Sequence, residues 1–107
     1  MPQEPKKLQS IAEHVEARKL AVPAILQHLR PRPVRIEWRK DKQGRAVAIR
    51  VFWPHIAGSK AADDFGEEEE LLTMTLPLVD SVTRAVDWTF VIAGAKNVGD
   101  LLRKAGR

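Results

Sequence analysis

The segment that decides the fold is residues 34–53, VRIEWRKDKQGRAVAIRVFW. Apolar and charged residues alternate in both of its halves, and a short polar stretch around Gly44 separates them. Such alternation is typical of strands with one buried face, and a glycine between two such runs is typical of a hairpin turn. The pattern therefore predicts a β-hairpin with strands over residues 33–40 and 45–53.

Two turns compete at the tip of this hairpin. A three-residue loop with Gly44 in the left-handed conformation would place Ile36 opposite Arg50, an apolar side chain against a charged one. A two-residue turn instead pairs Trp38 with Ile49 on the apolar face. Because a slip of one residue turns every side chain to the other face, we predict the two-residue turn.

Helices are predicted before the hairpin. Ser10 and Glu13 have the spacing of a capping box, in which each residue hydrogen-bonds the backbone of the other at the start of a helix. Pro23 lacks a backbone N–H and its ring clashes with the preceding turn, so this first helix should stop near Ala21. A kink there is the alternative to a stop. Proline suits the first position of a helix, which predicts a second short helix over 23–30.

A third strand and further helices are predicted after the hairpin. An acidic loop over 54–70 leads into a strand over 69–77, where apolar residues again alternate with polar ones. Apolar spacing of three and four residues predicts a helix over 79–87, while 88–93 fits either a helix or a strand. A final helix is predicted over 98–105. The expected fold is α+β, a three-stranded antiparallel meander with N-terminal helices and C-terminal helices packed on one face.

Composition indicates one small domain. The chain has 107 residues and is 44% hydrophobic, which suits a single packed core. We expect a flexible tail over 1–7 and a single α+β domain over 8–107. The sequence has no cysteine and no apolar run of the roughly 20 residues that a membrane span needs. We therefore expect a cytoplasmic protein with no cofactor and no membrane contact.

Charge is distributed unevenly along the chain. Residues 1–62 carry thirteen basic residues against five acidic ones, whereas residues 63–87 carry one against eight. Residues 88–107 carry four against one, and the net charge is +4. A basic body with an acidic segment indicates an anionic partner, a pairing of charges within the molecule, or a solvated surface without a specific partner.

No recognisable active site is present in the sequence. Its three histidines have no metal-ligand spacing, and the acidic run lacks the alternating oxygen ligands of a calcium-binding loop. The glycine-containing segment 94–99 lacks the Gly-Lys-Ser/Thr of a phosphate-binding loop. We therefore predict no catalytic and no metal-binding residue, and a binding protein in preference to an enzyme. The histidines are His14, His28 and His55.

Basic residues concentrate on the hairpin. Residues 30–50 carry eight lysines and arginines against two acidic residues. A two-stranded ribbon fits the major groove of DNA, and its basic side chains neutralise phosphates. The main prediction is therefore a small basic protein that binds the backbone of DNA or RNA through this hairpin. The predicted contacts are Arg35, Arg39 and Arg50 on the outward face and Lys40, Lys42 and Arg45 at the tip.

Two other functions remain open. In the first, the chain is a protein-interaction or assembly subunit, and the basic hairpin of one copy binds the acidic segment 63–70 of another copy or of an acidic protein partner. In the second, Glu37, Asp41 and Lys40 or Lys42 lie around a metal ion in a nuclease. The first predicts self-association that is lost at high salt, and the second predicts cleavage that depends on Mg²⁺.

The order of the expected elements resembles two nucleic-acid-binding folds. Helices between Ile11 and Leu29 followed by a basic hairpin are similar to a helix-turn-helix with its wing, although Glu16 stands where that motif has glycine and Pro23 interrupts it. The order helix, hairpin, third strand, helix resembles the double-stranded-RNA-binding domain, without that family's lysine-rich helix start after Leu78. These resemblances imply a nucleic-acid partner at the level of topology, which does not by itself fix function.

Overall fold

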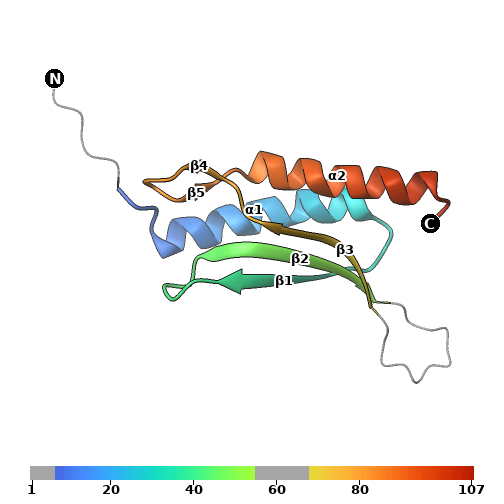
Figure 1. The fold of residues 1–107 in the computed structure, drawn as a ribbon, viewed down its shortest axis with the longest axis horizontal. Helices are drawn as coiled ribbons and strands as arrows, with labels where there is room; N and C mark the ends of the chain where they lie inside the picture. Colours follow the sequence, from blue (N-terminus) through green and yellow to red (C-terminus); the bar gives the residue numbers. More distant parts are fainter. Residues whose placement is uncertain (1–6, 55–67) are drawn as a thin grey trace.

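The chain forms two layers, a three-stranded sheet and a pair of helices (Figure 1). The computed structural model describes residues 7–54 and 68–107. Residues 1–6 of the expected tail and residues 55–67 of the expected acidic loop lie outside the described residues.

Both long helices lie on the same face of the sheet. The elements of these two layers are α1 (Ile11–Leu29), β1 (Arg35–Lys40), β2 (Ala46–Pro54), β3 (Glu68–Thr75) and α2 (Trp88–Lys104). The sheet is antiparallel with the strand order β1-β2-β3. Figure 1 shows α1 and α2 side by side above it. The predicted class is confirmed, an α+β fold with a meander sheet and an N-terminal and a C-terminal helix on one face.

The hairpin has the predicted register. Trp38 pairs with Ile49 and Ile36 pairs with Val51. Ile49 and Val51 are fully buried, and Trp38 and Ile36 pack against the core. The apolar alternation sets this register because a shift of one residue would turn all four side chains towards water.

The turn at the hairpin tip differs from the predicted two-residue turn. Gly44 has a φ of 95°, and its N–H donates to the carbonyl oxygen of Asp41 at 3.1 Å. The N–H of Asp41 donates to the carbonyl oxygen of Arg45 at 2.8 Å, which closes a three-residue loop. This loop alone would shift the register by one residue, but Val47 is an extra residue in β2 and restores it. The three-residue loop and the bulge together give the register that the apolar pattern requires.

One continuous helix, α1, replaces the two helices expected before the hairpin. The predicted capping box is present: the N–H of Glu13 donates to Ser10 Oγ at 3.1 Å, and the N–H of Ser10 donates to Glu13 Oε1 at 3.4 Å. Pro23 lies inside the helix with an exposed side chain, so the break near Ala21 and the separate helix over 23–30 are wrong. A proline inside a helix costs about 3 kcal/mol. The buried stripe continues across it and offsets this cost, since burying one large aliphatic side chain gains about 2 kcal/mol. The stripe consists of His14, Ala21, Ile25 and Leu29.

Two short strands occupy the segment where a helix was expected over 79–87. Strands β4 (Leu78–Asp80) and β5 (Ala85–Val86) form a separate antiparallel hairpin. One carboxylate oxygen of Asp80 accepts hydrogen bonds from two backbone amides of the turn, at 2.8 Å and 3.4 Å. An aspartate that bonds to its own turn competes with a helix, and the valine spacing is not a buried stripe because Val82 is 58% exposed.

Helix α2 runs through the region that the sequence left open. Asp87 caps its start, and the carboxylate of Asp87 accepts from the N–H of Phe90 at 3.2 Å. Residues 88–93 are therefore helical, and residues 98–104 continue the same helix, so the expectation of a separate helix over 98–105 is wrong. A single buried stripe passes through both halves of α2. It consists of Val91, Ala95, Gly99 and Leu102.

Two glycines allow α2 to approach its neighbours closely. A Cβ atom at Gly99 would overlap the backbone carbonyl oxygen of His28 in α1. A Cβ atom at Gly94 would lie 3.0 Å from the end of the Met74 side chain in β3. Helix α2 is therefore seated against α1 on one side and over β3 on another.

Candidate functional site

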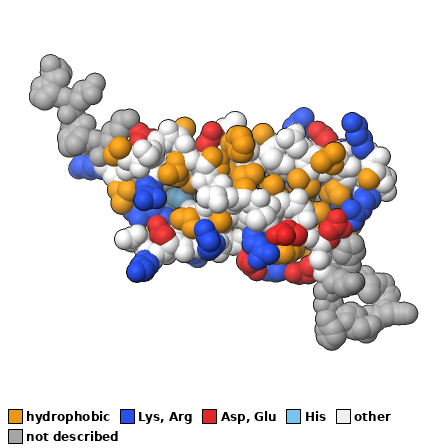
Figure 2. Space-filling model, viewed as in Figure 1, with side chains coloured by type: hydrophobic (Ala, Val, Ile, Leu, Met, Phe, Trp, Pro, Cys, Tyr) orange, Lys and Arg blue, Asp and Glu red, His pale blue; other side chains and the backbone are white. Residues whose placement is uncertain are grey.

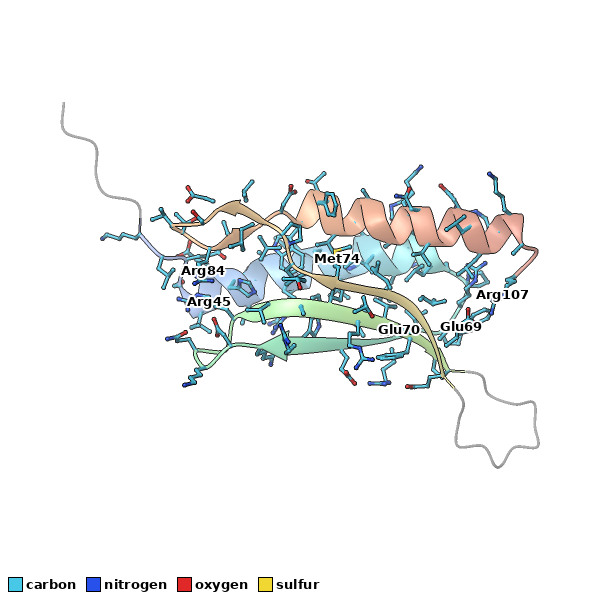
Figure 3. The ribbon with its side chains drawn as sticks, viewed as in Figure 1. Arg45, Glu69, Glu70, Met74, Arg84 and Arg107 are labelled. Atoms are coloured by element: carbon cyan, nitrogen blue, oxygen red, sulfur yellow. The ribbon has the colours of Figure 1, made fainter. Side chains whose placement is uncertain are left out.

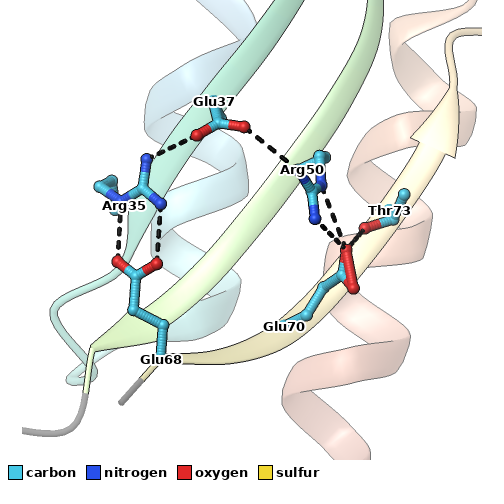
Figure 4. A network of polar contacts seen from close by, with 6 residues as sticks. All are labelled: Arg35, Glu37, Arg50, Glu68, Glu70 and Thr73. Atoms are coloured by element: carbon cyan, nitrogen blue, oxygen red, sulfur yellow. Dashed lines mark hydrogen bonds and ion pairs between the residues drawn. The ribbon is translucent and has the colours of Figure 1, made fainter. Parts of the chain in front are cut away.

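Arginines and glutamates form a network on the open face of the sheet, opposite the helices (Figure 4). Arg35 donates to both carboxylate oxygens of Glu68, from Nε at 2.9 Å and from Nη2 at 2.8 Å. Nη1 of Arg35 also donates to Glu37 at 2.9 Å. Arg50 contacts Glu37 at 3.5 Å and Glu70 at 3.2 Å. Each arginine therefore contacts two carboxylates, and Glu37 joins the two arginines.

The strand register brings these side chains together. Glu37 lies opposite Arg50 across β1 and β2. Glu68 and Glu70 lie two residues apart on β3, so both point to the open face. The sequence placed most of this acidic run in a loop, and it therefore gave no expectation that Glu68 would bind Arg35.

The two arginines of the network cover an aromatic side chain. The guanidinium carbons of Arg35 and Arg50 lie 4.6 Å and 4.8 Å from the centre of the Phe52 ring. Phe52 is only 8% exposed although it lies on the open face of the sheet. A guanidinium can stack its face on a ring while its edge binds carboxylates, so both contacts occur together. Arg35 and Arg50 thus shield Phe52 from water.

Hydrogen bonding keeps the network charged. The hydrogen bond from Arg35 lowers the pKa of the Glu68 carboxyl, and those from Thr73 and Arg50 lower the pKa of Glu70. The two carboxylate partners of Arg35 raise its pKa. Two arginines and three glutamates give the network a net charge of −1. These five side chains therefore have no excess positive charge to offer a phosphate backbone.

Three of the six predicted nucleic-acid contacts are thus engaged within the molecule. Arg35 and Arg50 bind carboxylates, and Arg45 is buried, with 8% of its surface exposed. Nε and Nη2 of Arg45 donate to the carbonyl oxygen of Gln9 at 3.1 Å and 2.8 Å. Arg45 therefore links the hairpin to the segment that precedes α1 and does not extend from the tip.

The other three predicted contacts are exposed. Arg39 shares the open face with the two arginines of the network, and Lys40 and Lys42 follow it towards the tip. Within residues 7–54 and 68–107, none of these three forms an ion pair. Figure 2 shows basic side chains at the end of the molecule where the hairpin turns.

The side chains considered for a nuclease site do not converge. Glu37 binds the two arginines of the open face. Asp41 closes the hairpin turn, where its Oδ1 accepts from the backbone amides of Gln43 and Arg45, both at 2.9 Å. Burial raises the pKa of Asp41, but these backbone hydrogen bonds outweigh it and the pKa lies below its ordinary value. The described part of the chain holds no group of three His, Asp or Glu side chains that could bind a metal ion.

The outer side of β3 is an open strand edge. Among the described residues, no strand pairs with that side. The N–H of Leu76 donates to the carbonyl oxygen of Val47 in β2 at 2.9 Å. Because the hydrogen bonds of antiparallel strands alternate, the backbone groups of Thr73 and Thr75 point away from β2, towards the open side.

Exposed apolar side chains of α2 lie beside this edge. Phe90 is 58% exposed and Leu101 is 65% exposed, and their spacing of about three helical turns puts them on one side of α2. Gly94, between them in sequence, packs on Met74 and Leu72 of β3, so this side of the helix lies over that strand. Figure 2 shows apolar side chains gathered along α2 and below it. The open edge of β3 with Leu72, Met74, Phe90 and Leu101 is called the β3–α2 flank below.

Three surfaces of different chemistry are thus present: a sheet face of paired charges, a basic hairpin tip and an apolar flank. Comparison of the chain with protein-family models, with curated proteins and with solved structures finds no match. In the described ranges, neither helix combines the length and the apolar character needed to cross a membrane.

Proposed function

We propose that this chain is a protein-interaction and assembly subunit that pairs with a second copy of itself through the β3–α2 flank. The observation that carries this proposal is an edge strand whose second half is uncharged, next to exposed apolar side chains of a helix. The sheet face, by contrast, is covered by ion pairs, which suit contact with water.

The two edges of the sheet differ in charge. Strand β1, RIEWRK, has four charged residues among six. Charges on an edge strand prevent it from pairing with other strands. Strand β3 has its charges at one end, over 68–70, and residues 71–76 are uncharged. The uncharged half of β3 is therefore the edge best suited to pair with another strand.

The charge pattern of β3 favours an antiparallel pairing of identical strands. A parallel pairing in register would set the glutamates at 68–70 beside their own copies, and opposed like charges destabilise a sheet. An antiparallel pairing centred on Thr73 sets Glu70 of one copy opposite Leu76 of the other. It also joins the outward backbone groups of the two Thr73 residues as a hydrogen-bonded pair. The result is a two-fold, self-complementary interface.

The helices add apolar area to this pairing. Because α2 lies over β3 in each copy, a two-fold axis through β3 places the two α2 helices side by side and antiparallel. Helix α2 has 17 residues. A helix of that length is about 25 Å long, and a helix with the sheet beneath it is about 20 Å deep. The flank therefore offers about 500 Å² per copy, below the roughly 800 Å² of a standard interface, which predicts a dimer of modest affinity.

Light scattering after size exclusion tests this proposal. Leu101→Lys places a charge in the flank, and Leu20→Lys is the matched control because Leu20 is 74% exposed on α1. The measurement uses about 100 μM protein, a concentration suited to a dimer of modest affinity. We expect the mass of a dimer for the wild type and for Leu20→Lys. We expect the mass of a monomer for Leu101→Lys. Salt at high concentration should leave the dimer intact, since the contact is apolar. A monomeric wild type, or a dimer that persists in Leu101→Lys, contradicts the proposal.

Binding of a nucleic-acid backbone is the second candidate function. It is favoured by Arg39, Lys40 and Lys42, which are exposed and form no ion pair within the described residues. With three phosphate contacts, affinity for duplex DNA should fall about 40-fold between 50 and 200 mM salt. Filter binding with all three residues changed to alanine tests it, with Lys19→Ala on α1 as the control. Equal affinity of the triple variant and the wild type contradicts it.

A further inference from the structure

A small cavity lies where the start of α1, the hairpin tip and the β4–β5 hairpin meet. Its volume is about 120 Å³. Part of its wall is apolar and includes Val47 and Leu78, and part is polar and includes Asp41, Arg45 and Arg84. Figure 3 shows the two arginines close together at this end of the molecule. Neither the β3–α2 flank nor the basic side chains of the hairpin tip explain this arrangement.

Arg45 brings a fixed positive charge to the cavity. It is 8% exposed, and both Nε and Nη2 donate to the carbonyl oxygen of Gln9. Nη1 of Arg45 has no hydrogen-bond partner in the described part of the chain. A guanidinium has five N–H donors, so Nη1 remains able to donate to a further acceptor. A ligand oxygen in the cavity would supply that acceptor.

Arg84 brings a second positive charge from a strained backbone position. Its φ is 62°, in the left-handed region that glycine adopts most readily. The turn uses this conformation, because the N–H of Arg84 donates to the carbonyl oxygen of Asp80 at 2.9 Å. Glycine would form the same turn without strain, so stability does not explain an arginine here. Strained backbone positions occur preferentially at binding sites.

The polar groups around the cavity leave one positive charge unbalanced. Arg45 and Arg84 face a single carboxylate, Asp41, whose Oδ1 is already engaged by two backbone amides. His14 also lines the cavity, and its Nε2 accepts from the N–H of Ala46 at 3.1 Å, so the ring is neutral. A ligand with one negative charge matches this balance. The apolar part of the wall matches a hydrocarbon group on the same ligand.

We infer that this cavity binds an aliphatic carboxylate, with its oxygens between Arg45 and Arg84 and its hydrocarbon part against Val47 and Leu78. An apolar cavity of about 150 Å³ admits benzene, so this one admits roughly five or six non-hydrogen atoms. A free short-chain acid and the C-terminal residue of a polypeptide both present this chemistry.

Titration of the ¹⁵N-labelled full chain tests the class of ligand. Butyrate should shift the amide signals of Ala46 and Arg84 with a dissociation constant of roughly 1–10 mM, as suits a ligand of this size. The uncharged analogue n-butanol, which has the same hydrocarbon part, should leave these signals unchanged. Equal shifts with n-butanol, tighter binding of inorganic phosphate, or no shift with butyrate at about ten times that constant would each overturn the inference.

A second pair of probes separates the two sources of carboxylate. N-acetylalanine presents a polypeptide C-terminus, and N-acetylalaninamide presents the same group without the charge. Binding of N-acetylalanine but not of the amide assigns the cavity to a polypeptide end. Binding of butyrate alone assigns it to a free acid, and equal binding of acid and amide overturns the role of the carboxylate.

Arg84→Gly separates binding from folding. This change removes one guanidinium and relieves the backbone strain, so we expect a higher Tm together with a loss of butyrate affinity of about tenfold or more. Arg84→Lys retains the charge and the strain, and it should keep most of the affinity. Undiminished butyrate binding by Arg84→Gly shows that Arg84 does not hold the ligand and overturns the assignment.

Discussion

Nε2 of His14 accepts a hydrogen bond from the backbone N–H of Ala46 at 3.1 Å, which joins α1 to β2 inside the molecule. Because Nε2 is the acceptor, the ring proton lies on Nδ1, and Nδ1 donates to Oε1 of Gln9 at 3.3 Å. His14 is 1% exposed. Protonation of Nε2 would place a charge in the interior and remove the side-chain acceptor to which Ala46 N–H donates.

Acid should therefore destabilise the fold through His14. Burial lowers the pKa of His14 below its ordinary value of 6.5, and the charges of Arg18 and Arg45 lower it further. The unfolded chain then binds this proton more readily than the folded one, so stability is full above pH 6.5 and declines as the pH falls below it. Urea unfolding from pH 7.5 to pH 5 measures the decline. Glutamine in His14→Gln keeps an acceptor but does not titrate, so this variant should lose most of the decline in the free energy of unfolding. Equal declines in the wild type and the variant would contradict this account.

Gly99→Ala should destabilise the protein more than Gly94→Ala does. Both changes improve helix propensity by about 1 kcal/mol. The new methyl group at Gly99 meets the backbone of His28, whereas the one at Gly94 meets the flexible end of Met74. We expect a net loss of about 1–3 kcal/mol for Gly99→Ala and little change for Gly94→Ala, measured by urea unfolding. A smaller loss at Gly99 than at Gly94 would show that the helices are not packed as described.

Glu68→Gln should increase affinity for nucleic acid if the sheet face is masked by its own carboxylates. This change releases Arg35 from its two-oxygen contact, so the salt dependence of duplex binding should gain about one phosphate contact. The control is Glu16→Gln on α1, which changes the net charge equally at a distance from the sheet. Filter binding at several salt concentrations measures the slopes. Identical slopes for the two variants would show that Arg35 stays unavailable even without its partner.

The hairpin was predictable in its register but not in its turn. Alternation of apolar residues around Trp38 and Ile49 required one register, and the molecule has it. Two departures from regular geometry cancel within that register, the left-handed loop at Gly44 and the extra residue Val47. The apolar pattern predicts only which residues pair, and that register depends on the loop and the bulge together. It cannot distinguish this pair from a regular two-residue turn.

The errors elsewhere came from local signals that tertiary packing overrides. Pro23 is unfavourable within a helix, but the buried stripe on both sides of it keeps α1 continuous. The valine spacing over 79–87 suggested a helix, yet the carboxylate of Asp80 binds the turn amides and forms a hairpin. The spacing of Phe90 and Leu101 was a usable signal for the flank. It becomes visible only when α2 is treated as one helix.

The outcome for the basic hairpin shows the limit of charge counting. Exposure of Arg39, Lys40 and Lys42 could be predicted from the alternation and from the tip. The burial of Arg45 depends on Gln9, which is distant in sequence, and the pairing of Arg35 depends on Glu68 from a third strand. Net charge along a segment does not report such contacts.

The most direct test of the proposed assembly uses a cysteine at Thr73. The chain has no cysteine, so a disulfide in Thr73→Cys joins two copies. Hydrogen-bonded antiparallel partners have Cα atoms about 5.5 Å apart, within the range that a disulfide spans. Gln43→Cys, at the exposed hairpin tip, is the matched control. Under mild oxidation at micromolar concentration, we predict rapid covalent dimers of Thr73→Cys and slow dimers of Gln43→Cys, and equal rates for the two variants would contradict pairing through β3.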